Sequence, residues 1–181
     1  MNDNLLTVTF TLSKDLIFEA VKADTFITGQ TTKAADGSNT AQVYNVQAGD
    51  ETYHERKLFR TLRGALGTLE SNMADFVDSS EQASAISDTL DENSSTFDIV
   101  FTTSSRFKRG LANAISQMAQ EFLINQMLVL WWVTSNQNLA TTYKTLAQES
   151  LLAIRRCLAK TAPTAAQASF ASVSSQITYQ S

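Results

Sequence analysis

The stretch FLINQMLVLWWVTSNQ, residues 122–137, is the most apolar passage of the chain and contains both of its tryptophans. The apolar run itself covers residues 122–133, and Asn125 and Gln126 interrupt it. A helix that crosses a bilayer needs about 20 mostly apolar residues, so this run is too short for a membrane span. A helix that becomes apolar on all sides at one end instead enters the centre of a bundle. We therefore predict a core helix, with an apolar surface that meets another subunit as the alternative.

The sequence on either side of this run predicts where the long C-terminal helices begin and end. The central helix is expected to begin with Ser104 or Ser105 as its N-cap and to end near Ser135. A last long helix is expected over 139–161, and it ends before Pro163, the only proline.

Two further helices are predicted earlier in the chain. Ser13 is the expected N-cap of an amphipathic helix over 14–27. A longer helix is predicted over 51–77, and a short one near 81–90. The side chains expected to face inward from 14–27 are Leu16, Ile17, Ala20 and Val21. Those expected to do so from 51–77 are Leu58, Leu62, Ala65, Leu66, Leu69, Met73, Phe76 and Val77. Gly64 and Gly67 lie inside the longer helix and suggest close packing against a second helix.

Two segments alternate between apolar and polar residues, which is typical of half-buried strands. They are TVTFTL (7–12) and TFDIVF (96–101). Two isolated strands form only a marginal sheet, so we expect them to pair with each other and to pack against the helices. The fold is thus predicted to be mainly α, a helical bundle of three to four helices with a small two-strand β element.

The length of 181 residues suits one ordinary domain, so residues 1–181 are expected to form a single domain. Residues 29–50 are rich in Gly, Thr, Asn and Asp, and we predict a long polar loop or a hairpin around the DG dipeptide. Residues 164–181 are small and polar and are expected to form a flexible tail. The start, MNDNLLTVTF, lacks the pattern of a secretory signal, which favours the cytoplasm of the producing cell.

Residues that usually carry enzyme chemistry are scarce. His54 is the only histidine and lies at the polar start of a helix, so we predict a solvated surface residue. Cys157 is the only cysteine and lies beside an apolar stripe, so we predict a buried structural thiol. One Cys and one His cannot form a structural zinc site, and no phosphate-binding loop or nucleophile-elbow motif occurs. We predict a protein that is not an enzyme and that uses no cofactor, metal or small-molecule substrate.

Charge is distributed unevenly along the chain. Residues 70–98 hold eight acidic residues and no basic one, whereas residues 99–181 hold seven Lys and Arg against two Glu, a balance of +5. Such an asymmetry can orient a molecule against other copies of itself or against other proteins. Direct contact with nucleic acid is less favoured, because the whole chain has a net charge of −4.

Seven residues are candidates for a contact surface. Cations in the first turn of a helix oppose its dipole unless an anionic partner compensates, and SSRFKRG places three there. Two arginines near the end of the last helix and the two adjacent tryptophans complete the set. The candidates are Arg106, Lys108, Arg109, Arg155, Arg156, Trp131 and Trp132.

Residues 97–164, FDIVFTTSSRFKRGLANAISQMAQEFLINQMLVLWWVTSNQNLATTYKTLAQESLLAIRRCLAKTAPT, resemble small virion proteins of tailed phages and prophages of gut bacteria. The shared order is a strand, a Ser cap, a long helix ending in a Trp-containing apolar run, an Asn-containing turn, a Tyr/Ala helix, Arg and Pro. The segments VTFTLSKDLIFEAV and LFRTLRGALGTLESNMADFV fit the same layout.

This resemblance implies a structural subunit, a head–tail connector, neck or tail-terminator-like component that forms a ring. The partners would then be further copies of the chain and other virion proteins, and the protein would reside in the virion after assembly in the bacterial cytoplasm. No functional residue is transferred from the resemblance. The alternative is a small helical protein-binding or regulatory domain without catalytic activity.

Overall fold

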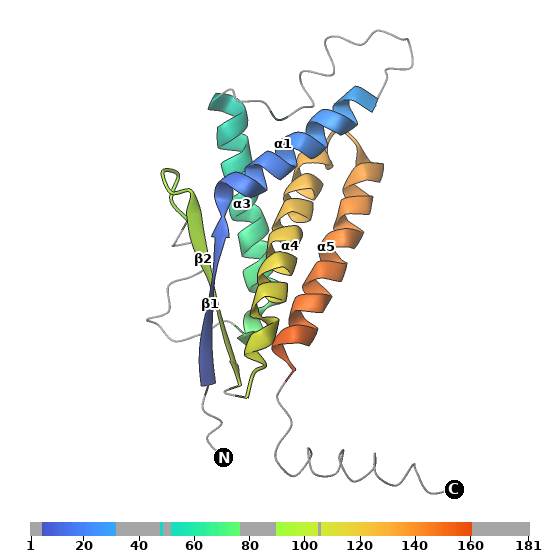
Figure 1. Ribbon diagram of the computed structural model, residues 1–181. Helices are drawn as coiled ribbons and strands as arrows, with labels where there is room; N and C mark the ends of the chain where they lie inside the picture. The colour runs from blue at the N-terminus through green and yellow to red at the C-terminus, as the bar shows by residue number, and fades with distance from the viewer. Residues whose placement is uncertain (1–4, 32–47, 49–51, 77–89, 105, 161–181) are drawn as a thin grey trace, which may run out of the picture.

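A computed structural model describes residues 5–31, 48, 52–76, 90–104 and 106–160 (Figure 1). The elements, in chain order, are β1 (Leu5–Ser13), α1 (Lys14–Thr31), α3 (Thr52–Asn72), the 3-10 turn η1 (Ala74–Phe76), β2 (Thr96–Ser104), the 3-10 turn η3 (Arg109–Leu111), α4 (Ala112–Trp132) and α5 (Gln137–Leu158). The predicted mainly helical fold with one small two-strand sheet is confirmed.

Strands β1 and β2 pair antiparallel, as predicted, and each is longer than the alternating segment that predicted it. Phe10 lies opposite Ile99, and Leu12 lies opposite Phe97. These four side chains are buried against the helices, while the threonines of β1 lie on the exposed face. The alternation of the sequence therefore decides which face of the sheet joins the core.

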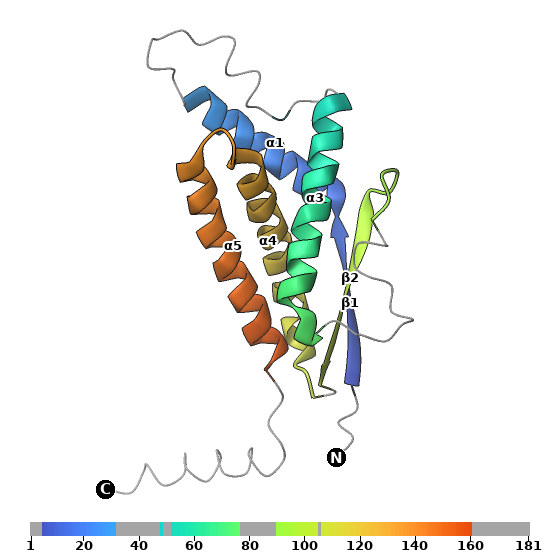
Figure 2. The ribbon, with the colours of Figure 1, turned by 180° about the vertical axis from the view of Figure 1, so that it is seen from behind.

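Helix α4 lies at the centre of the molecule (Figures 1 and 2). Helices α3 and α5 run alongside it, α1 crosses it, and β1 also contacts it. This arrangement explains why its second half is apolar on nearly all sides. The prediction of a core helix is confirmed, because its buried residues are Ile115, Ala119, Phe122, Leu123, Asn125, Met127, Leu128, Trp131 and Trp132. Leu130 is an exception within the apolar run and is 37% exposed.

Most of the apolar stripe predicted for 51–77 is confirmed. Its fully buried members are Leu58, Leu62, Ala65, Leu66, Leu69 and Met73, whereas Phe76 is half-buried and Val77 lies outside the described residues. Gly64 lies where α3 approaches α4, since a Cβ atom built on it would be 3.1 Å from Leu130 Cδ1. Gly67 has nothing within 4 Å of the equivalent position, so only the first of the two glycines marks a close helix contact. The helix ends at Asn72 rather than at residue 77.

Ser13 caps α1 as predicted, because its Oγ accepts a hydrogen bond of 3.3 Å from the Leu16 N–H. Leu16 itself was expected to face inward, and this was wrong: its side chain is 55% exposed. The apolar side chains that α1 buries in the core are those of Ile17 and Val21, and neither is accessible to solvent. The cause is the position of the other elements, which cover only a narrow side of α1.

The residue at the junction of β1 and α1, Lys14, is buried although it is charged. Its Nζ donates to the backbone oxygens of Glu92 (2.6 Å) and Asp91 (3.4 Å). Its backbone N–H donates to Ser95 O at 2.8 Å. Lys14 therefore ties the start of α1 to the turn that precedes β2, and the carbonyl oxygens compensate for the buried charge.

The predicted start of the central helix was wrong. Helix α4 begins at Ala112, and its N-cap position is Leu111, which supplies no side-chain hydrogen bond. Ser104 instead organises a turn, because its Oγ accepts from the Arg106 N–H and its backbone oxygen accepts from the Phe107 N–H. Ser105 lies outside the described residues.

Helix α5 begins at Gln137, where the Asn136 side chain accepts a 3.2 Å hydrogen bond from the Leu139 N–H. It ends at Leu158, earlier than predicted. Helix α1 extends to Thr31, so the chain is still helical at 29–31, where the polar loop was predicted to begin. Most of that loop, most of the short helix expected near 81–90, and the tail 164–181 lie outside the described residues.

Candidate functional site

Three of the predicted contact residues surround one buried aromatic side chain. Arg106, Lys108 and Arg109 are exposed, whereas Phe107 between them is buried. The Phe107 N–H donates to Ser104 O at 2.8 Å and closes the turn after β2. The buried ring fixes this turn and leaves the flanking cations at the surface. These cations were expected in the first turn of α4, and this was wrong, because all three precede that helix.

The other two candidate arginines lie in the last turn of α5, where cations interact favourably with the helix dipole. Arg155 Nη2 lies 2.7 Å from the Asp75 carboxylate, and Nη1 donates to the backbone oxygen of Asn72 at 2.9 Å. Arg155 thus caps the C-terminal end of α3 and joins it to α5 within one chain. Arg156 is exposed. At least one carboxylate of the acidic segment 70–98, that of Asp75, is therefore paired with a basic residue of the same chain.

A buried hydrogen bond brings the two groups of cations to one end of the molecule. Thr103 Oγ1 donates to Leu158 O at 2.9 Å and so ties the last turn of α5 to the end of β2. The connection from β2 to α4 and the C-terminal end of α5 accordingly lie together in Figures 1 and 2. We call the exposed cations gathered there the basic end: Arg106, Lys108, Arg109, Arg156 and Lys160. Lys160 was not among the candidates, although its sequence distance from Arg156 already suggested one helix face.

The tryptophans are buried within the chain. Trp131 is 3% exposed and Trp132 is 2% exposed. The Nζ atom of Lys57 lies 3.6 Å from the centroid of a Trp131 ring, and the His54 ring lies 6.2 Å from Trp131. The start of α3 therefore covers the indole of Trp131, and neither tryptophan is available at the surface of a single described chain.

The pKa values of two titratable groups are shifted, one on α3 and one on α1. Burial lowers the pKa of the Lys57 ammonium, and the nearby charge of Arg60 lowers it further. The cation–π contact with Trp131 acts in the opposite direction, because it favours the charged form. Burial also raises the pKa of the Asp24 carboxyl group in α1. His54 is half-buried rather than solvated as predicted, and Cys157 is half-buried against the core.

Several large apolar side chains are exposed on the described helices. Phe26 and Ile27 are 49% and 60% exposed near the end of α1, which lies at the end of the molecule opposite the basic end in Figure 1. Leu146 and Leu152 are exposed on α5. Exposed apolar residues are common singly, whereas a contiguous apolar patch favours a contact with another protein surface.

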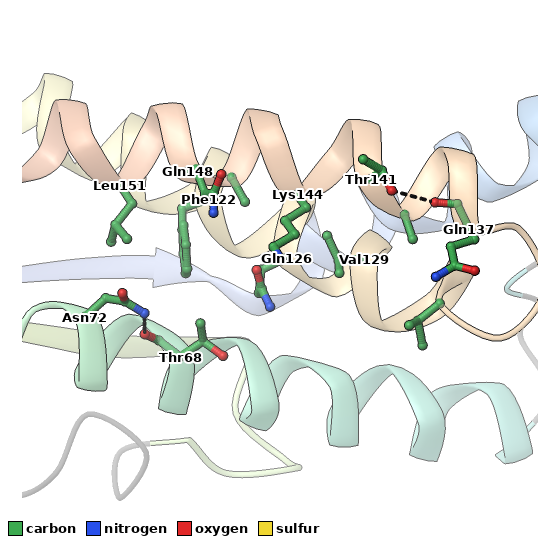
Figure 3. A pocket seen from close by; sticks show the side chains of 13 residues that line it. Thr68, Asn72, Phe122, Gln126, Val129, Gln137, Thr141, Lys144, Gln148 and Leu151 are labelled. Atoms are coloured by element: carbon green, nitrogen blue, oxygen red, sulfur yellow. Dashed lines mark hydrogen bonds between the residues drawn. The ribbon is translucent and has the colours of Figure 1, made fainter.

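A groove of about 490 Å³ runs over α4 between α3 and α5 (Figure 3). The sequence did not predict it, because it depends on how far α3 and α5 stand apart. The described residues that line it are Thr68, Asn72, Phe122, Gln126, Val129, Val133, Gln137, Ala140, Thr141, Lys144, Ala147, Gln148 and Leu151. We call it the α3/α5 groove.

Comparison of the chain with protein-family models, curated proteins and solved structures found no match. Within the described ranges, no helix is long and apolar enough to cross a membrane. In the same part of the chain, no three His, Cys, Asp or Glu side chains are placed to hold a metal ion together. Function is therefore inferred from the surfaces of this chain and from the resemblance of residues 97–164.

Proposed function

We propose that the chain is a structural subunit of a phage or prophage virion, a head–tail connector or neck component that assembles with further copies of itself into a ring. The resemblance of residues 97–164 supports the virion class. The basic end supports the assembly role and is the observation on which this proposal depends. The protein would reside in the virion, after assembly in the cytoplasm of the producing bacterial cell.

The basic end favours an acidic partner. Its five side chains are exposed and carry the same charge, so an opposed anionic surface would lower their mutual repulsion. The exposed Asp91 and Glu92, in the described part of the acidic stretch 70–98, would offer such a surface on another copy. A ring requires two different contacting surfaces on each subunit, and a basic surface against an acidic one satisfies this requirement.

Charge alone would not hold such a ring together. Exposed ion pairs contribute only about 0–1 kcal/mol each and are screened by salt. The exposed apolar residues of α1 and α5 would supply most of the affinity, because burial of apolar surface contributes about 25 cal/mol per Å². The charges would then determine which surfaces meet.

The test is light scattering coupled to size-exclusion chromatography, at about 0.1 M and about 1 M salt, where the Debye length falls from about 10 to about 3 Å. We expect a defined oligomer of the wild-type chain at low salt. The variant R106E/K108E/R109E should give smaller or irregular species with unchanged circular dichroism.

The matched control is R60E/R63E/K144E, which changes the net charge equally through exposed residues of α3 and α5. It should assemble like the wild type. Normal assembly of the first variant would remove the basic end from the interface. A wild-type chain that is monomeric under both conditions, with no portal, capsid or tail genes beside its own gene, would favour the small helical binding domain instead.

A further inference from the structure

Helix α1 presents apolar side chains on two of its sides. Ile17 and Val21 form the side that faces the other elements, and neither is accessible to solvent. With this side α1 contacts α4 and β2, and it crosses α4 on the outside of the bundle (Figures 1 and 2). A surface helix normally carries polar residues on the side that faces away from the core. Helix α1 departs from this pattern.

The outward side of α1 carries an apolar stripe, which we call the α1 stripe. Its members recur at steps of four, three and four, the spacing of neighbours on one helix face, and they are Leu16, Ala20, Ala23 and Ile27. Leu16 is 55% exposed and Ile27 is 60% exposed, Ala23 is exposed and Ala20 is half-buried. Phe26, 49% exposed, widens the patch at one end. A contiguous exposed apolar patch marks a surface that meets another protein.

The shape of the α1 stripe suits a second helix. Large side chains stand at its two ends, at Leu16 and Ile27, and the two alanines between them leave a shallow depression. Large apolar side chains of an opposing helix would interdigitate there. The eleven positions from Leu16 to Ile27 correspond to about 17 Å, or three turns of an α-helix. Steps of four and three are also those of the seam between two paired helices.

Two carboxylates flank the α1 stripe. Glu19 directly precedes Ala20, and Asp24 directly follows Ala23. Successive residues of a helix point about 100° apart, so the two carboxylates lie on opposite edges of the stripe. Neither forms a salt bridge with another described residue. Burial raises the pKa of the Asp24 carboxyl group, so a cation beside it would favour its charged form.

These edges determine the charge of the partner. An opposing helix with basic residues on both sides of its apolar face would compensate both carboxylates. The α1 stripe of a second copy fits less well, because it would bring further carboxylates to the edges and no cation.

We propose that the α1 stripe is the docking surface for an amphipathic helix of another protein, one that has large apolar side chains on one face and Lys or Arg along both edges of that face. The contact uses neither the basic end nor a second copy, so it does not depend on the proposed ring. The exposed leucines of α5 would remain for contacts between copies.

The probe is a fluorescein-labelled peptide of three heptads, with Leu at the two core positions and Lys at the two flanking positions of each heptad. Repulsion between its lysines keeps the peptide from pairing with itself. A second peptide carries Glu in place of every Lys. Fluorescence anisotropy at about 0.15 M salt measures the Kd of each for the full-length chain. The wild-type chain should bind the lysine peptide roughly tenfold more tightly or better, because its acidic edges attract one peptide and repel the other.

Three variants locate the binding surface. E19K/D24K should reverse the preference between the two peptides. The matched control E121K/E149K changes the net charge equally through exposed residues of α4 and α5 and should keep the wild-type preference. Ala23→Gln fills the depression with a polar side chain at unchanged charge and should weaken binding of the lysine peptide roughly tenfold. If Ala23→Gln alters the circular dichroism, Leu16→Gln takes its place with the same expected loss.

Each other outcome overturns the proposal. A wild-type chain that binds neither peptide, or both equally, has no such docking surface. Loss of the preference in E121K/E149K would place the binding on α4 and α5. Unchanged binding in both Ala23→Gln and Leu16→Gln would reduce it to attraction between opposite charges. A wild-type dimer in sedimentation experiments that Ala23→Gln abolishes would show that a second copy occupies the α1 stripe.

Discussion

The contact between α3 and α4 at Gly64 can be tested by adding a single methyl group. Gly64→Ala and Gly67→Ala make the same change three residues apart on the exposed side of one helix. Each should gain about 1 kcal/mol from the higher helix propensity of alanine. At Gly67 nothing lies within 4 Å of the new methyl group, so the full gain is expected there.

At Gly64 the new methyl group would lie 3.1 Å from Leu130 Cδ1, a few tenths of an ångström closer than ordinary contact. Leu130 is 37% exposed, so its side chain can move towards solvent rather than into the core. We expect the adjustment to cost about 0.5 kcal/mol, below the usual cost of overpacking a closed core. The net gain at Gly64 should therefore be about half of that at Gly67.

Thermal unfolding with calorimetry or circular dichroism measures this difference. For a chain of this size, 1 kcal/mol corresponds to about 2–4 °C in Tm, so Gly67→Ala should raise Tm by that amount and Gly64→Ala by about half. In a Leu130→Ala background, Gly64→Ala should regain the full increase, because the contacting atom is gone. Equal increases for the two glycines in the wild-type background would refute the close approach of α3 and α4.

Three further predictions follow from burial and charge. Leu123→Ala should lower the free energy of unfolding by about 2–5 kcal/mol, because the Leu123 side chain is fully buried, and Leu130→Ala should lower it by less than half as much. Urea unfolding compares the two variants, and equal losses would contradict the placement of α4. Asp75→Ala should lower the free energy of unfolding by no more than about 1 kcal/mol, because the side chains of the Asp75–Arg155 ion pair are 73% and 41% exposed, respectively. The loss should be smaller in about 1 M salt, and an equal loss there would contradict an ion-pair origin. The raised pKa of Asp24 means that the folded state holds its proton more tightly than the unfolded state, so the stability from this group is present at acid pH and lost as pH rises through the folded pKa. Asp24→Asn should therefore raise Tm at neutral pH relative to wild type and leave it nearly unchanged below the ordinary aspartate pKa; the same shift at both pH values would exclude a titration effect.

Much of the fold was predictable because its signals are local. The alternation in the two strands and the stripe of Leu58, Leu62 and Leu66 each specify a face of one element, whatever packs against it. Leu16 could not be placed in this way, because which side of α1 is covered depends on elements distant in sequence. The start of α4 was missed for a similar reason. The serines before it suggest a helix cap, but the burial of Phe107 directs the chain into a separate turn first.

The candidate site was predictable only as a set of residues. The sequence named the cations before α4 and at the end of α5, but their common location depends on the contact of Thr103 with Leu158. Arg155 was expected to face another copy, whereas it bonds to Asp75 and Asn72 of its own chain. The tryptophans were candidates because an apolar surface that meets another subunit was the alternative to a core helix, yet several elements surround α4 and cover both of them.

The pairing of β1 with β2 has a consequence for the order in which the chain folds. Ser13 lies opposite Thr96, 83 positions later, and Lys14 bonds to the turn just before that point. The α4–α5 hairpin, in contrast, closes over residues 133–136 only. By the logarithmic dependence of closure entropy on length, joining the strands costs about 3 kcal/mol more than closing the hairpin. The hairpin should therefore form first and β1 should dock last, so substitutions at Phe10 are expected to accelerate unfolding in stopped-flow experiments while leaving the refolding rate almost unchanged.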